Sequence, residues 1–206
     1  MTFDAWLTFS GLWFLLGLPV GPNAIATLST AARDGVGAGL AVAAGITLAG
    51  LLHATLATFG FGAVLTAWPA AFDALQLAGA GYLAWLGTRL ILRAGLVVPA
   101  VAAGRPAWRA VRHGALVSLS NPKAILTYMA AFPAALDPAA PIMGQFAILL
   151  PTALGIVFVI YAGHAMVGVG IGRALLSASR RRWFDRAAGG MFVGCAALLA
   201  ASALRR

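Results

Sequence analysis

The strongest constraint on this chain is a series of six long apolar stretches, at about 5–32, 36–62, 68–92, 113–136, 142–171 and 187–204. Each has close to, or more than, the roughly 20 apolar residues that a helix needs to cross a bilayer. Charged residues make up only 9% of the chain, against about 25% in soluble domains, so they are too few to cover a soluble surface. We therefore expect an all-α integral membrane protein, with residues 1–206 forming a single transmembrane domain.

Several other classes are excluded by the same composition. The net charge of +9 is concentrated in short connecting segments instead of one solvated face, so no nucleic-acid partner is expected. The single cysteine, Cys195, allows neither an intramolecular disulfide nor a thiolate metal site. The sequence shows no catalytic constellation, so we expect no enzyme activity, no cofactor and no bound metal.

The arginines predict the orientation. The segments after the first, third and fifth stretches hold eleven of them, whereas the alternate segments 1–4, 63–67 and 137–141 hold none. Short loops rich in arginine stay in the cytoplasm, which places both termini outside and makes the segment at about 93–112 a cytoplasmic loop. Arg205 and Arg206, at the end of the chain, are the exception.

The sequence also repeats itself. Residues 21–31 match residues 121–131 at five of eleven positions, including both prolines, and the pairs His53-Ala54 and His164-Ala165 follow in the same order. The matches divide the chain into pseudo-repeats at 1–98 and 112–206. Because each repeat has three spans, an odd number, the second must be inverted relative to the first. This architecture occurs in secondary transporters, whose substrate site lies between the halves near the bilayer midplane.

Both repeats carry a proline inside their first span. Pro22 and Pro122 should break helices 1 and 4, since proline lacks a donor and suits the first turn of a new helix. The free N–H groups and positive dipole ends of the two half-helices would then meet from opposite directions and favour an anion. A simple kink is the alternative.

Lys123 is the only lysine, and it lies at the second break, far from every aspartate in the sequence. A charge in that place is costly and marks a candidate site. Its ammonium must lose its proton, bind carbonyls at the half-helix end, or meet an anionic group of the substrate; snorkelling to the interface is the alternative. Asn23 and Asn121, the only asparagines, suit a zwitterion or else cap the half-helices.

Two pairs of matched residues have less certain roles. His53 and His164 are candidates for proton coupling, because histidine as a residue type ordinarily titrates near neutral pH; helix packing is the alternative. Asp73 and Asp185, near the starts of the third and sixth spans, are predicted to be helix N-caps.

These motifs resemble the LysE/RhtB family of bacterial amino-acid exporters. The resemblance rests on Gly-Pro-Asn at 21–23, the Arg-Asp-Gly turn at 33–35 before a glycine-rich span, Tyr-Leu-Ala-Trp-Leu-Gly at 82–87, and Asn-Pro-Lys-Ala at 121–124. It implies export of amino acids or their derivatives across the bacterial inner membrane, driven by the proton gradient. The matching motif residues, which the resemblance implies bind substrate, are Gly21, Pro22, Asn23, Asn121, Pro122 and Lys123.

The chain departs from that family at two points. Val20 stands where members often have proline, and no acidic residue lies near Gly50, where members often have one. That leaves His53, His164 or Lys123 as the group that carries the proton, or no proton coupling at all. The alternatives are an exporter of cations, metal ions or other small metabolites, and a membrane enzyme or scaffold. The expected partners are the lipid bilayer and a small-molecule substrate, an amino acid, with neutral ones favoured; a homodimer stays open.

Overall fold

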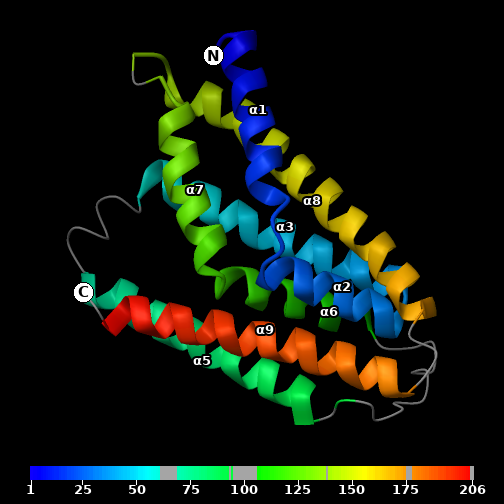
Figure 1. The fold of residues 1–206 in the computed structure, drawn as a ribbon. Helices are drawn as coiled ribbons and strands as arrows, with labels where there is room; N and C mark the ends of the chain where they lie inside the picture. Colours follow the sequence, from blue (N-terminus) through cyan, green and yellow to red (C-terminus); the bar gives the residue numbers. More distant parts are fainter. Residues whose placement is uncertain (61–68, 93, 95–105, 138, 175–177, 205–206) are drawn as a thin grey trace.

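The computed structural model describes residues 1–60, 69–92, 94, 106–137, 139–174 and 178–204, and the structure they form is helical (Figure 1). Proline, glycine and charged residues separate the apolar runs, and each run folds into one or two helices. In these ranges the helices are α1 (Phe3–Gly17), α2 (Pro22–Asp34), α3 (Val36–Phe59), α5 (Pro69–Leu92), α6 (Ala107–Leu119), α7 (Pro122–Ala135), α8 (Ile142–Ala174) and α9 (Ala178–Leu204).

Two of these helices are long and apolar enough to cross a membrane alone, Val36–Phe59 and the Ile142–Ile171 part of α8. The pair α1 and α2 counts as a third candidate if it forms one span, which is bent by 63° at its break. Helices α6 and α7 have 13 and 14 residues, so each is shorter than a span by itself. The all-α prediction is confirmed, whereas six crossings arranged as an inverted repeat stay a prediction.

Both predicted breaks are present. Helix α1 ends at Gly17 and α2 begins at Pro22, and likewise α6 ends at Leu119 and α7 begins at Pro122. Proline is favoured there because its missing N–H would have no partner in the first helical turn. Each break therefore leaves a short non-helical segment inside the apolar stretch, with a new helix N-terminus on its far side.

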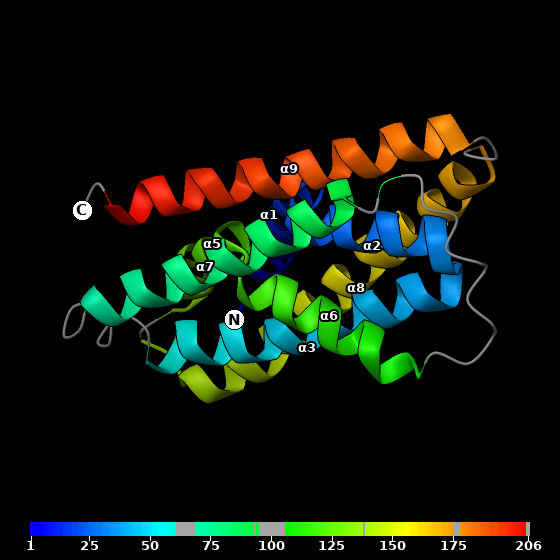
Figure 2. The same cartoon turned by 90° about the horizontal axis from the view of Figure 1, so that it is seen from below.

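The two new helices start near the centre of the molecule and lead away in different directions (Figure 1). Helix α2 is the most enclosed, with nine buried residues among its thirteen. One buried apolar cluster joins α2 to α3, α5, α6 and α9, through residues such as Ile25, Ile46 and Phe192. Helices α5 and α9 run side by side along one flank in both ribbon views (Figures 1 and 2).

Glycines permit the closest helix contacts. A Cβ added to Gly45 of α3 would overlap the backbone carbonyl of Val111 in α6, and one added to Gly114 would overlap that of Val42. Helices α5 and α9 meet in the same way at Gly87 and Gly189. Small residues are the usual means by which membrane helices approach so closely.

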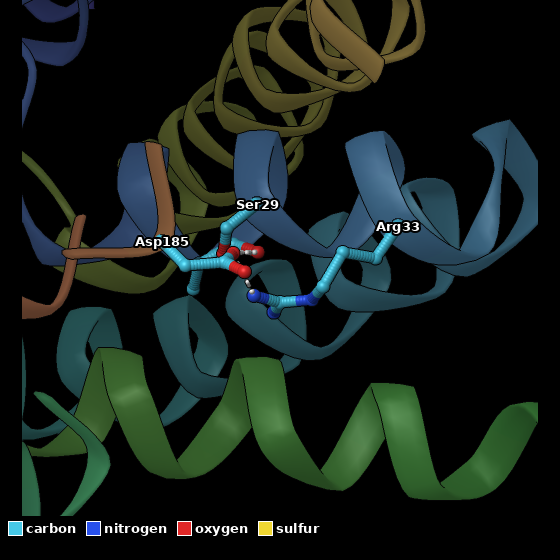
Figure 3. Close-up of polar contacts among 4 residues, drawn as sticks. Ser29, Arg33 and Asp185 are labelled. Carbon is cyan, nitrogen blue, oxygen red and sulfur yellow. Dashed lines mark hydrogen bonds and ion pairs between the residues drawn. The ribbon is translucent and has the colours of Figure 1, made fainter. Parts of the chain in front are cut away.

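An ion pair fastens α2 to α9. Arg33 donates from Nη1 to Oδ1 of Asp185 over 3.3 Å, and the Asp185 side chain is 6% exposed (Figure 3). The prediction that Asp185 caps a helix is wrong, because α9 begins seven residues earlier, at Ala178. Asp73 likewise lies inside α5, which begins at Pro69. The apolar pattern predicts only the apolar part of a helix. Helix α9 begins earlier, in the basic residues that precede its apolar part.

Another helix also begins before the apolar stretch that predicted it. Helix α6 begins at Ala107, so the predicted loop at about 93–112 ends earlier than expected. The part of that loop at 95–105, the segment 63–67 and the terminal Arg205 and Arg206 lie outside the described residues.

Candidate functional site

The two breaks are joined directly by their asparagines. Asn121 donates from Nδ2 to Oδ1 of Asn23 over 3.0 Å, and Asn23 donates from Nδ2 to Oγ of Ser118 over 3.3 Å. All three residues are buried. The side chain of Asn23 in α2 is therefore bonded to both sides of the other break, because Ser118 lies in α6 and Asn121 precedes α7.

The capping alternative holds for one asparagine only. Asn121 is the N-cap of α7, and its Oδ1 accepts from the backbone N–H of Lys123 over 3.1 Å. The N-cap of α2 is Gly21, which has no side chain to accept a bond, and Asn23 lies one residue inside the helix. The first turn of α2 thus has no side-chain cap, which leaves its N–H groups available to an anion.

The Lys123 ammonium binds a backbone carbonyl, which is one of the three outcomes predicted for it. Its Nζ donates to the backbone oxygen of Pro19 over 3.1 Å, in the non-helical segment between α1 and α2. Gly21 faces the Lys123 side chain, because a Cβ built there would lie 3.9 Å from Lys123 Cδ. The Lys123 ammonium is thus held by a neutral backbone oxygen.

Of the predicted site residues, Asn23, Asn121 and Lys123 border a cavity of about 50 Å³. Asn23, Ser118, Asn121 and Lys123 supply its polar wall, and Tyr161 of α8 stands among its other lining residues. A volume of this size holds a few water molecules, whereas pockets for small-molecule ligands usually measure about 300–1,000 Å³. A molecule as large as an amino acid therefore fits only after the surrounding helices move apart.

Aromatic side chains close one end of the cavity. Trp13 of α1 and Tyr128 of α7 both line it, and their rings meet edge to face at 4.7 Å between centroids. Phe9 and Phe132 pack behind Trp13, at 5.3 Å each. This buried aromatic group therefore joins α1 to α7, the halves of the two broken helices that lie on the far side of each break from α2 and α6 respectively.

The two matched histidines differ in their surroundings. His53 is buried against the ring of Tyr128, and its Nδ1 has no hydrogen-bond partner. His164 Nδ1 lies 2.8 Å from the carbonyl oxygen of Ile160, one turn earlier in its own helix α8. Neither ring bonds to Asn23, Asn121 or Lys123 in any described contact.

Comparison with known proteins now decides the family. The family profile of the LysE type translocators matches residues 14–203, which include both breaks and every residue of the cavity wall except Trp13. The chain belongs to the LysE type translocator family. It is accordingly a membrane transporter and not an enzyme.

Curated relatives extend over nearly the whole chain. A homoserine/homoserine lactone efflux protein of Salmonella typhimurium is 30% identical over 203 residues, covering 98% of both chains. A leucine efflux protein of Enterobacter sp. is 28% identical over 199 residues, covering 95% of this chain and 94% of the relative. An uncharacterized membrane protein of Vibrio cholerae is 27% identical over 201 residues, covering 97% and 98%. No solved structure matches the LysE-type chain significantly.

Sequence reasoning missed most of the cavity's lining residues, including those with hydroxyl groups. Ser118 carries no repeat signal, and Tyr128 and Tyr161 resemble ordinary aromatic residues of membrane helices. A signal existed for Thr127, which matches Thr27 in the other repeat and also lines the cavity. The tyrosines reach the cavity through tertiary packing, which the spacing of a single helix does not reveal.

Proposed function

We propose that this LysE-type translocator exports amino acids or their derivatives from the cytoplasm by alternating access, driven by the proton gradient across a bacterial inner membrane. The observation that carries the proposal is the hydrogen bond between Asn121 and Asn23, which joins the two helix breaks beside Lys123. Gly21, Pro22, Asn23, Asn121, Pro122 and Lys123 form the proposed substrate site.

A zwitterion matches the chemistry of this site. The substrate carboxylate would take the place of the Pro19 oxygen on Lys123 and meet the uncapped N-terminus of α2. The side-chain oxygens of the two asparagines can accept bonds from the α-ammonium. Among the described lining residues there is no carboxylate for a cationic side chain, so neutral substrates are favoured.

The two halves at 1–98 and 112–206 supply the moving parts. In an inverted repeat, rocking of one half against the other opens the central site to each side in turn. The small cavity beside the two breaks is consistent with one step of such a cycle. The coupling proton would bind to His53 or His164, the two histidines at matched positions of the repeats.

Transport is tested directly in vesicles. Purified protein in liposomes loaded with neutral, cationic and anionic amino acids should release the neutral ones fastest, and an acidic outer solution should accelerate release. Empty liposomes and protein-containing liposomes without a pH gradient are the controls. Release of no amino acid above the empty-liposome rate, with or without the gradient, would overturn the proposal.

The orientation gives a separate prediction. Reporter fusions near residues 103 and 178 should signal the cytoplasm, and one near residue 140 should signal the outside. The arginine distribution supports this orientation, and so does the arrangement of the helices, since the end of α2 and the start of α9 lie at one end of the molecule and the N-terminus at the opposite end (Figure 1). The reverse pattern of signals would refute the orientation.

A further inference from the structure

An ion pair joins α2 to α9 at the end of the molecule where α2 ends and α9 begins (Figure 1). Arg33 lies in the last turn of α2 and donates to the buried carboxylate of Asp185 over 3.3 Å, and Ser29, one turn earlier, faces the same side of α2 (Figure 3). Arg33 belongs to the first proposed repeat and Asp185 to the second. The pair therefore connects the two halves that would move against each other during transport.

Helix α2 links this ion pair to the proposed substrate site. The helix begins at Pro22, and Arg33 follows Asn23 by ten residues, a rise of about 15 Å along an α-helix. Asn23 is hydrogen-bonded to Asn121 across the two breaks. Because α2 is one unbroken helix, a movement of its far end away from α9 also shifts its N-terminus at the site.

The opposite end of the molecule, where the N-terminus lies, is held by different chemistry (Figure 1). There Trp13 of α1 packs against Phe132 of α7, and its indole N–H donates to the backbone oxygen of Ala153 in α8. The match between the repeats places Pro133 at the position of Arg33, so the second copy has no basic residue there. The contact between Arg33 and Asp185 thus has no counterpart of the same kind at the matched position.

An ion pair suits a contact that breaks and forms repeatedly. Two ions gain little net free energy from pairing inside a protein, because the loss of their hydration largely offsets their attraction. The Arg33 side chain is 25% exposed, and Asp34 beside it is exposed at the predicted cytoplasmic turn. Water at that turn can therefore hydrate both ions when α2 and α9 separate, whereas separated aromatic rings expose apolar surface.

We propose that Arg33 and Asp185 form the cytoplasmic gate of this transporter. The pair holds α2 against α9 while the cytoplasmic side is closed, and it breaks each time an amino acid enters the site from the cytoplasm. This inference rests on the proposed export function and names what controls access to its site. Neither side chain is among the described residues that line the cavity, so both act through the position of α2 and not by contact with the substrate.

The accessibility of the cavity from each side of the membrane tests the gate. Thr127→Cys places a reporter thiol in the cavity, in a background without the native thiol, Cys195→Ala. A membrane-impermeant maleimide is applied to inverted vesicles, which expose the cytoplasmic side, and to right-side-out vesicles. Asp185→Asn should raise the labelling rate from the cytoplasmic side about tenfold, the effect of losing one charge-assisted hydrogen bond, without raising it from the outside.

Matched variants separate a gate from a structural role. Asp34→Asn removes an exposed carboxylate next to Arg33 and should be labelled as slowly as the background protein. The exchanged pair, Arg33→Asp with Asp185→Arg, should again be labelled slowly, because the attraction between α2 and α9 is restored. A protein that is merely loosened by loss of the pair would be labelled faster from both sides.

A covalent link tests whether the two helices must separate. In the Cys195→Ala background, Arg33→Cys with Asp185→Cys supplies two thiols for a short, reducible bis-methanethiosulfonate reagent. The linked protein in liposomes should release almost no amino acid, and a reductant should restore release. This measurement does not depend on the folding of Asp185→Asn.

The outcomes distinguish the gate from the export function. Equal cytoplasmic labelling of Asp185→Asn and the background protein, faster labelling from the outside, or full-rate release by the linked protein would overturn the gate while export stands. The ion pair would then be a fixed fastening between α2 and α9. Release of no amino acid by the wild-type protein would overturn export itself, and the labelling rates would still show whether the pair controls access to the cavity.

Discussion

Replacement of Lys123 by alanine should reduce transport at subsaturating substrate by about 10- to 100-fold, the loss expected for one charge-assisted hydrogen bond. The protein should still fold and insert, because the ammonium is held by the single oxygen of Pro19 and its removal takes a costly charge out of the helix break. The measurement is the initial rate of release from loaded liposomes, compared at equal amounts of inserted protein. Arg109→Ala removes one positive charge from an exposed position on α6 and should transport normally.

The shape of the charge matters as well as its sign. Lys123→Arg should recover little transport, since a planar guanidinium has a different reach from a compact ammonium. Amino-acid amides, which keep the ammonium but lack the carboxylate, should compete poorly for the wild-type protein. Equal competition by an amide and by its parent amino acid would show that Lys123 is not the carboxylate site.

Local rules predicted the break itself. Proline fixes where a new helix begins, so Pro22 and Pro122 could be placed from the sequence, and Asn121 as the N-cap follows from the preference of that position for short polar side chains. Asn23 is also a short polar residue beside a break, but it lies inside α2 and is not its N-cap. Its bonds to Ser118 and Asn121 span almost a hundred residues, and no local rule predicts them.

Hydropathy explains the misplaced helix ends. The apolar stretch at 187–204 was predicted as the last span, yet α9 already begins at Ala178. Arginine is a good helix former, so the basic residues before the apolar run continue the same helix outside the membrane core. Asp185 therefore lies within the helix, where it is free to pair with Arg33.

The close contact between α3 and α6 lies next to the break between α6 and α7. Gly45→Ala should destabilise the protein by about 1–3 kcal/mol, because the new Cβ meets the backbone of Val111 in α6, which no side-chain rotation can move aside. Helix α6 carries Ser118 and leads directly to Asn121, so a displaced α6 also lengthens the bonds to Asn23. We expect a lower melting temperature in detergent together with a lower transport rate.

The same helix offers a matched control for that experiment. Gly37 lies near the start of α3 with nothing within 4 Å of an added Cβ, so Gly37→Ala should be neutral or slightly stabilising. Gly114→Ala tests the contact from the other side, because its Cβ would meet the Val42 backbone, and it should behave like Gly45→Ala. If Gly45→Ala melts and transports like Gly37→Ala, then α3 and α6 do not pack this closely. The hydrogen bonds of Asn23 with Ser118 and Asn121 would then not depend on the contact between α3 and α6.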